Sequence, residues 1–249
     1  MHQDLSGVVL RAVDYKETDR ILTVLTDQNG LMTVKAQGCR KKNSPLAAPT
    51  QLLVYSHMTL FEYRDYWSVK EATVQEQFLG VREDLEKLSL ASYIAEVAQC
   101  VGVEGESNPE LLSLVLNSFY ALDKLQKPPE LIRAAFDLKC MSIAGYAPLL
   151  DACAVCGLPE PEGPYLNLQE GVLHCKSCKH EVGEGRSVPM TREMLAAARH
   201  IVYGDPKRLF SFTLLPDQLP PFAALASSYL TTQLERDFKT LDFYLSVKG

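Results

Sequence analysis

Hydrophobic positions change their period near residue 80 of the 249-residue chain. Before that point apolar and polar residues nearly alternate, and the runs are rich in Val, Leu, Thr and aromatic residues, which is typical of β-strands. Five such runs are found at residues 7–15, 20–26, 30–38, 51–63 and 66–74. Asn29-Gly30, between the second and third runs, predicts a hairpin turn because both residues tolerate positive φ. Five short strands favour a small closed barrel such as an OB-fold over a sandwich, which usually needs about seven.

From about Val81 the apolar residues follow a helical period instead. Predicted helices cover residues 82–101, 108–125, 129–145, 191–204 and 221–247. The second opens with Asn108 as N-cap and Pro109 at the first helical position, and Gly145 ends the third.

The two patterns together predict an α+β fold of three parts. The predicted domains are an OB-fold at residues 1–80, a helical domain at 81–152 and 187–249, and a cysteine-containing module at 153–186 that is inserted into the helical domain. Composition agrees with a globular protein, since 47% of the residues are hydrophobic.

Targeting signals are absent from the sequence. No run of eighteen apolar residues occurs, and the first ten residues lack the basic and apolar regions of a signal peptide. We therefore expect a cytoplasmic protein that does not act in a membrane. Seven cysteines, an odd number, argue against a disulfide framework there and favour thiols or metal ligands.

Charge is distributed unevenly along the chain, whose net charge is −6. Residues 81–152 carry six basic and eleven acidic residues, so the middle of the chain is acidic. No Asp or Glu occurs between Gln28 and Phe61. The basic residues of that stretch are Lys35, Arg40, Lys41 and Lys42. Such a local patch makes an anionic ligand compatible with an acidic protein.

The clearest chemical motif is a pair of Cys-x-x-Cys sequences. Their residues are Cys153, Cys156, Cys175 and Cys178. Two pairs separated by eighteen residues are typical of a tetrahedral four-thiolate zinc site assembled from two turns. Iron and four free thiols remain the alternatives. We expect His174 and His180, which flank the second pair, at the surface, because four cysteines complete the coordination sphere.

No catalytic motif is present in the sequence. A four-thiolate site leaves no open position for water, so a zinc ion there would be structural rather than hydrolytic. The chain has no GxxxxGK[ST] phosphate loop, no GxGxxG, no GxSxG and no HExxH sequence. A thioredoxin-like redox role would need a Cys-x-x-Cys that opens a helix, whereas Pro and Gly surround these pairs. The sequence therefore predicts a binding protein and not an enzyme.

Three short motifs, together with the order of the predicted domains, resemble those of a known protein family. They are Tyr-x-Glu-x-Asp-Arg at residues 15–20, Gly-x-Arg-Lys at 38–41 and Gly-Tyr-x-Pro at 145–148. With these motifs the chain resembles the bacterial RecO family of recombination mediators over nearly its whole length. The resemblance implies an N-terminal OB-fold, annealing of complementary strands, and cooperation with RecR to load RecA on DNA coated with single-strand-binding protein. Because some relatives lack the cysteines, it also implies that the one zinc ion is structural.

An OB barrel binds single strands with cations that contact phosphates and aromatic faces on which bases stack. The predicted DNA-binding residues are Arg20, Lys35, Arg40, Lys41, Lys42, Tyr66 and Trp67. We expect Tyr66 and Trp67 in a turn, whereas Tyr15 and Tyr63 are expected in the barrel core. A solvated loop is the alternative for the charges, and core packing is the alternative for the aromatic residues.

A second predicted site lies in the acidic middle of the chain. Arg133 and Phe136 are three residues apart on one helix face, where an exposed cation beside apolar surface could receive the acidic C-terminal tail of single-strand-binding protein. The alternative places Phe136 in the core and Arg133 at its solvated edge. The predicted partners are single- and double-stranded DNA, RecR and that tail, at the nucleoid in the cytoplasm. A zinc-ribbon adaptor that binds only proteins is the competing interpretation.

Overall fold

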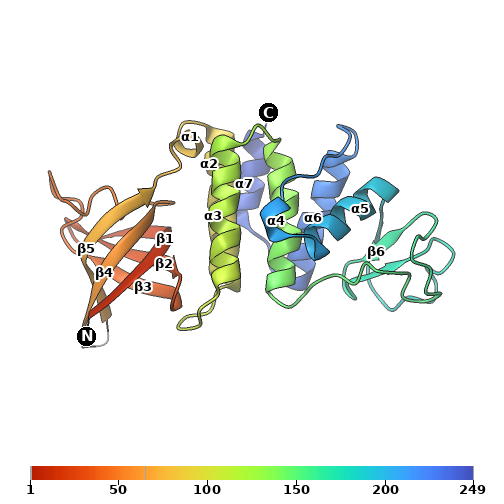
Figure 1. Cartoon of the computed structure of the whole chain (residues 1–249), viewed down its shortest axis with the longest axis horizontal. Helices are drawn as coiled ribbons and strands as arrows, with labels where there is room; N and C mark the ends of the chain where they lie inside the picture. Colours follow the sequence, from red (N-terminus) through yellow and green to blue (C-terminus); the bar gives the residue numbers. More distant parts are fainter. Residues whose placement is uncertain (1, 65, 249) are drawn as a thin grey trace. The chain divides into compact units, whose positions relative to one another are not determined.

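The computed structural model describes residues 2–64 and 66–248, which form two compact units (Figure 1). The first unit consists of Met1–Gln126 together with Lys239–Gly249, and the second consists of Lys127–Phe238. The first unit is therefore discontinuous in the sequence, and the second is inserted into it. The predicted division at residues 80, 153 and 186 stays a prediction.

Five strands form a closed barrel in the first unit. They are β1 (His2–Tyr15), β2 (Asp19–Thr26), β3 (Gly30–Ala36), β4 (Tyr55–Tyr63) and β5 (Tyr66–Glu76). Their order is β1-β2-β3-β5-β4, and β4 pairs with β1 to close the barrel. Neighbouring strands are antiparallel except β3 and β5, which run parallel. The barrel is OB-like, and the predicted five-strand barrel is confirmed.

Alternation along the strands builds the barrel core. In β3, for example, Met32 and Val34 are buried while Thr33 between them is exposed. The core is completed by Leu5, Val9, Leu22, Val24, Ala36, Cys39, Leu46, Met58, Leu60 and Val69. The predicted hairpin joins β2 to β3, with Gly30 at φ +59. A Cβ atom at Gly30 would collide with the carbonyl oxygens of Val103 and Glu106, so the close approach of this turn requires glycine.

Helices complete the first unit beside the barrel. They are α1 (Leu79–Arg82), α2 (Leu85–Val101), α3 (Pro109–Lys124) and α7 (Lys239–Val247). Asp84 and Asn108 cap α2 and α3 with side-chain oxygens that accept backbone N–H groups of the first turn. Gln99 of α2 donates from Nε2 to the Leu10 carbonyl at 3.3 Å, which ties this helix to β1.

The second unit combines helices with a small sheet that carries the cysteine segment. Its helices are α4 (Pro129–Ile143), α5 (Arg192–Tyr203), the 3₁₀ helix η1 (Pro206–Arg208) and α6 (Leu219–Gln233). The sheet has the order β7-β6-β8, with β6 (Tyr165–Asn167), β7 (Val172–His174) and β8 (Ser187–Pro189). Because β7 ends directly before Cys175, the sheet places the second cysteine pair.

One predicted helix is wrong in its length. Residues 221–247 form two helices, α6 and α7, separated by residues 234–238. Glu235 has φ +48 in that gap, a left-handed conformation that interrupts a right-handed helix. No helix of the described ranges has both the length and the hydrophobicity needed to cross a lipid bilayer.

Candidate nucleic-acid interface and metal centre

The basic residues of the barrel lie on an anchored loop between β3 and β4. Cys39 and Leu46 are buried in the barrel core, with exposed fractions of 2% and 7%. Between these two anchors, Arg40, Lys41 and Lys42 are exposed. Because both ends of this segment are fixed in the core, the loop presents its cations at a defined place on the barrel.

Asp19 ties the loop to β2. Its carboxylate accepts the Gly38 N–H at 2.8 Å and the Thr18 hydroxyl at 3.2 Å, and it forms an ion pair with Lys35 at 3.2 Å. The Gly38 N–H is the main cause that lowers the pKa of Asp19 below its ordinary value; burial opposes it, and Lys35 and Thr18 add to it. One carboxylate therefore fixes both the start of the loop and the Lys35 ammonium group.

Asp14 forms a second set of ion pairs. Its Oδ1 lies 3.0 Å from Arg20 Nε, and its Oδ2 lies 3.2 Å from Arg40 Nη2. Arg20 is the cross-strand partner of Asp14, whereas Arg40 comes from the loop. Three predicted DNA-binding cations therefore have carboxylate partners: Arg20, Lys35 and Arg40. Lys41 and Lys42 make no ion pair within residues 2–64 and 66–248.

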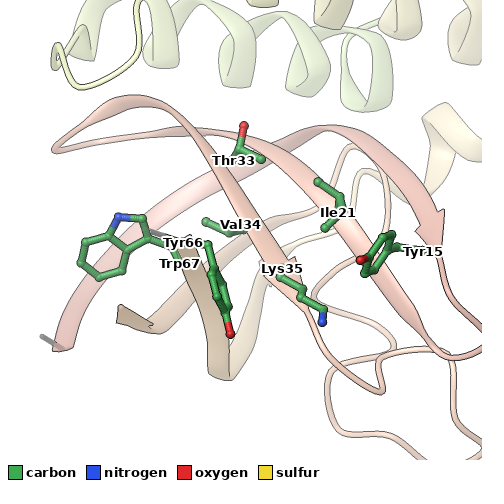
Figure 2. Close-up of a pocket in the computed structure, with 7 residues that line it drawn as sticks. All are labelled: Tyr15, Ile21, Thr33, Val34, Lys35, Tyr66 and Trp67. Atoms are coloured by element: carbon green, nitrogen blue, oxygen red, sulfur yellow. The ribbon is translucent and has the colours of Figure 1, made fainter. Parts of the chain in front are cut away.

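A pocket of about 340 Å³ opens beside Lys35. It is lined by Tyr15, Ile21, Thr33, Val34, Lys35, Tyr66 and Trp67 (Figure 2). Lys35 Nζ lies 5.2 Å from the centre of the Tyr15 ring, and Figure 2 shows the Lys35 side chain directed toward the part of the pocket where Tyr15 lies. Aromatic faces next to an ammonium group suit a nucleotide, whose base stacks and whose phosphate accepts hydrogen bonds.

The aromatic residues differ from the sequence prediction. Tyr66 and Trp67 begin β5 instead of lying in a turn; Tyr66 is 43% exposed, and Trp67 packs in part against the barrel core. The prediction that Tyr15 and Tyr63 lie in the core is wrong, because they are 43% and 47% exposed. Tyr63 packs edge-on against Tyr66, with 5.8 Å between ring centres. Arg11 was the available signal for Tyr15, since alternation places both on one face of β1 and a charged residue marks that face as outward.

Four cysteine side chains meet in the second unit. The sulfur atoms of Cys153, Cys156, Cys175 and Cys178 all lie within 4.8 Å of one another. Cys156 and Cys175 have 3.5 Å between their sulfurs. In a tetrahedral site with Zn–S bonds of about 2.3 Å, sulfurs lie about 3.8 Å apart, so the observed cluster has a suitable size. The donor set therefore fits a four-coordinate, thiolate-binding metal ion.

The pKa values of these thiols also fit a site that binds a cation. Burial is the main cause that raises the pKa of Cys175 to about 12, and the sulfurs of Cys156 and Cys153 add to it. Burial likewise raises the pKa of Cys178. Burial also acts on Cys153, but backbone N–H groups, those of Cys156 and Cys175 most, outweigh it and lower its pKa to about 6. Cys153 is thus the favoured thiolate, and a divalent cation would allow all four cysteines to bind as thiolates.

His174 holds the second cysteine pair from inside the module. It is fully buried, so the prediction that it lies at the surface is wrong. Its Nδ1 lies 2.9 Å from the Cys175 carbonyl oxygen, and its Nε2 lies 2.8 Å from the Ser187 hydroxyl. Both ring nitrogens are therefore satisfied without a metal. His180 is exposed, as predicted.

Arg199 of α5 attaches the first cysteine turn to the rest of the second unit. It donates to the carbonyl oxygens of Leu150 at 2.8 Å and Asp151 at 3.1 Å, and also to that of Pro159. These oxygens lie on both sides of the first cysteine pair in the sequence, so contacts other than a metal also position this turn.

The predicted partner site at Arg133 and Phe136 is wrong. Phe136 is fully buried and Arg133 is 2% exposed, because α4 packs against α5 and α6. Arg133 forms ion pairs with Asp137 at 3.7 Å and Glu130 at 3.8 Å, and it donates to the Ser227 hydroxyl on α6. Carboxylates three residues before and four residues after an arginine were the signal in the sequence, since such spacing places them on the same helix face.

Known protein families and relatives match this chain over nearly its whole length. The family model described as Recombination protein O N terminal matches residues 1–78, and the one described as Recombination protein O C terminal matches residues 82–242. The DNA repair protein RecO of Acetivibrio thermocellus is 32% identical over 239 residues, which cover 96% of this chain and 94% of that relative. The DNA repair proteins RecO of Alkaliphilus metalliredigens and Desulforamulus reducens are each 29% identical, over 95% and 96% of this chain and 96% and 92% of their own length. The resemblance read from three short motifs is thereby confirmed, and the chain belongs to the RecO family.

Proposed function

We propose that this protein, whose family membership gives it a role in DNA repair and recombination, is a DNA-binding mediator and not an enzyme. It binds single- and double-stranded DNA, anneals complementary strands, and with RecR helps to load RecA on DNA coated with single-strand-binding protein. The observation that carries this proposal is the anchored basic loop beside an aromatic pocket on one OB-like barrel.

In this mechanism, different residues contact the phosphates and the bases. Lys41 and Lys42 are exposed and available to backbone phosphates, which carry no sequence information. Tyr15 and Tyr66 offer faces on which unpaired bases stack. Annealing then follows from charge, because one cationic surface that neutralises phosphates of two strands reduces their mutual repulsion. Base pairing itself is left to the strands.

Zinc is the metal proposed for the four-cysteine cluster, with a structural role. Four thiolates in a tetrahedral site suit zinc and leave no position for a reactive water. The cysteine turns hold few apolar residues, so a metal ion supplies folding free energy that side-chain burial does not.

RecR and the C-terminal tail of single-strand-binding protein are proposed partners because of the family assignment. The burial of Arg133 and Phe136 removes the one surface that had been predicted for the tail. The proposed location is the nucleoid in the cytoplasm.

Annealing of two labelled complementary oligonucleotides tests the proposal directly. We expect the full-length protein to speed annealing and to bind each single strand, more weakly as salt rises. Lys41→Glu with Lys42→Glu should lower the binding affinity about tenfold or more. Lys207→Glu with Arg208→Glu is the matched control, because it reverses two exposed charges in the second unit.

A protein-only adaptor is the second candidate, and the internal pairing of Arg20, Lys35 and Arg40 is the observation that favours it. If the protein is such an adaptor, it should capture RecR but should neither bind the oligonucleotides nor change their annealing rate. That result would overturn the DNA-binding proposal.

A further inference from the structure

Asp14 lies between two arginines that come from different segments of the barrel. Its oxygens are used separately, Oδ1 by Arg20 Nε at 3.0 Å and Oδ2 by Arg40 Nη2 at 3.2 Å. The Asp14 side chain is 54% exposed, so it is accessible to displacement from solvent. Two guanidinium groups that converge on one place repel each other unless an anion lies between them. The two arginines therefore form an anion seat, which Asp14 fills in this structure.

We propose that Arg20 and Arg40 form a seat for one backbone phosphate of a nucleic-acid strand, and that the phosphate enters by displacing the Asp14 carboxylate. This inference rests on the proposed function and deepens it. A phosphodiester has two non-bridging oxygens that share one negative charge, and guanidinium groups bind such a pair as they bind a carboxylate. Asp14 then sets the affinity of the barrel by competing with DNA.

Contacts other than Asp14 hold the Arg40 side chain and the backbone of Arg20 in place. The Arg40 backbone N–H donates to the Thr18 carbonyl at 2.9 Å, and Arg40 Nη1 donates to the Glu17 carbonyl at 3.3 Å. Arg20 is held in the ladder between β1 and β2. Since none of these contacts involves the Asp14 side chain, a phosphate has to break two exposed ion pairs and no backbone hydrogen bond.

The neighbouring pocket favours a nucleic acid over an acidic peptide. Tyr15 follows Asp14 directly in β1 and lines the pocket together with Lys35, Tyr66 and Trp67 (Figure 2). Because successive residues of a strand point to opposite faces, the pocket and the seat lie on the two faces of β1 at its end. A nucleic-acid strand has both phosphates for the seat and flat bases for the pocket, whereas a run of acidic residues has no aromatic face to stack there.

Asp14→Asn tests the seat, with Glu17→Gln as its matched control. Both variants remove one negative charge near the turn between β1 and β2, but of the two side chains it is Asp14 that bridges Arg20 and Arg40. The probe is a fluorescein-labelled oligothymidylate, titrated with full-length protein at low salt. We expect Asp14→Asn to bind about threefold to tenfold more tightly, the size expected when two exposed ion pairs no longer compete. Glu17→Gln should gain less than about twofold, from long-range charge alone.

A double-mutant cycle shows whether the gain comes from the arginines. In a background with Arg20→Gln and Arg40→Gln, Asp14→Asn should gain no more than Glu17→Gln. A gain that persists there, or equal binding of Asp14→Asn and Glu17→Gln while the wild type binds DNA, overturns the seat and leaves the proposed function standing. A wild-type protein that does not bind the oligonucleotide overturns both. Tighter binding of polyglutamate, but not of oligothymidylate, by Asp14→Asn would assign the seat to protein carboxylates and also overturn the proposal.

A second variant guards against a folding artefact. Asp14→Ser should repeat the gain, and unchanged circular dichroism should show that both variants are folded. A gain confined to Asp14→Asn would count against the competition mechanism.

Discussion

The cysteine cluster and the basic loop have opposite electrostatic needs. In the cluster, potential anions are gathered, and burial with close neighbouring sulfurs raises the pKa of Cys175 and Cys178. In the loop and the strands beside it, cations are gathered, and Asp14 and Asp19 supply opposite charges at 3.0–3.2 Å. The second region thus contains its own counter-ions, whereas the first becomes fully charged only when a cation is added.

This difference determines how each region depends on a ligand from outside the chain. The metal ion proposed for the cluster would complete the fold of the cysteine turns, so its loss should affect stability. Nucleic acid adds nothing that the basic loop needs in order to fold, and it has to compete with carboxylates of the protein. Loss of loop cations should therefore change affinity and leave stability nearly unchanged.

The largest expected effect is the loss of the metal site. Cys175→Ser should lower the zinc content from one ion per chain and make residues 153–186 sensitive to protease. We expect the melting temperature to fall by at least roughly 5 °C, because one kcal/mol is worth about 2–4 °C in a chain of this length and a structural zinc contributes several. Metal analysis, limited proteolysis and thermal melting measure the three effects, while strand annealing should largely survive.

Cys100→Ser is the matched control for the cysteine cluster, since Cys100 is a partly buried thiol of the first unit and lies outside the cluster. It should retain the metal. A wild-type protein without zinc, or one whose four cluster cysteines all react quickly with a thiol reagent in the native state, would contradict the assignment.

The features predicted correctly from the sequence depend on local patterns. Five alternating runs and Asn29-Gly30 were enough for the barrel, because a period of two and a tight turn are properties of neighbouring residues. The cysteine cluster was equally readable, since two Cys-x-x-Cys turns require the same geometry wherever they occur. In both cases the spacing of residues in the chain is itself the structural constraint.

The features that were missed depend on partners distant in the sequence. The ion-pair partners of Arg133, Glu130 and Asp137, lie on its own helix and could be read from the sequence, but its burial depends on α6, where Ser227 accepts its hydrogen bond. Asp14 on β1 and Asp19 on β2 gain their second partners, Arg40 and Gly38, only when the loop after β3 folds back on these strands. A single sequence contains these residues but not their pairing.

An intermediate effect is expected at the basic loop. Replacing Arg40, Lys41 and Lys42 with Ala should weaken binding to every single-stranded sequence alike, because phosphate contacts do not read bases. The log–log salt slope should flatten by about 0.7 per lost contact, roughly two units for three contacts, of which the two lysines account for about 1.4. Binding near 0.1 M salt should weaken roughly tenfold to hundredfold.

Matched replacement of Lys176, Lys207 and Arg208 with Ala separates the loop from net charge, since these exposed cations lie in the second unit. The control should keep the wild-type slope. If the loop variant binds with wild-type affinity and slope, the cluster serves a protein partner or solubility, and the comparison between the two regions fails for the loop.

The smallest effect is expected at Asp19, where the loop is tied to β2. The pKa of Asp19 is lowered below its ordinary value of 3.8, mainly by the Gly38 N–H, so the folded state binds this proton less readily than the unfolded state. The stabilisation from its carboxylate is therefore complete above pH 3.8 and is lost as the pH falls through the lower, folded-state pKa.

Asp19→Asn removes this contribution at every pH. Its melting temperature should lie slightly below that of the wild type at neutral pH, and the two should converge in acid, once the wild-type carboxylate is protonated as well. Asp4→Asn, on the exposed part of β1, is the control and should show no such convergence, because the Asp4 carboxylate accepts a hydrogen bond from Thr59 that an amide oxygen also accepts. If the melting temperatures of the wild type and Asp19→Asn differ equally at neutral and acid pH, the Asp19 side chain acts through its shape and not its charge. Asp19 would then no longer count among the internal counter-ions of the loop.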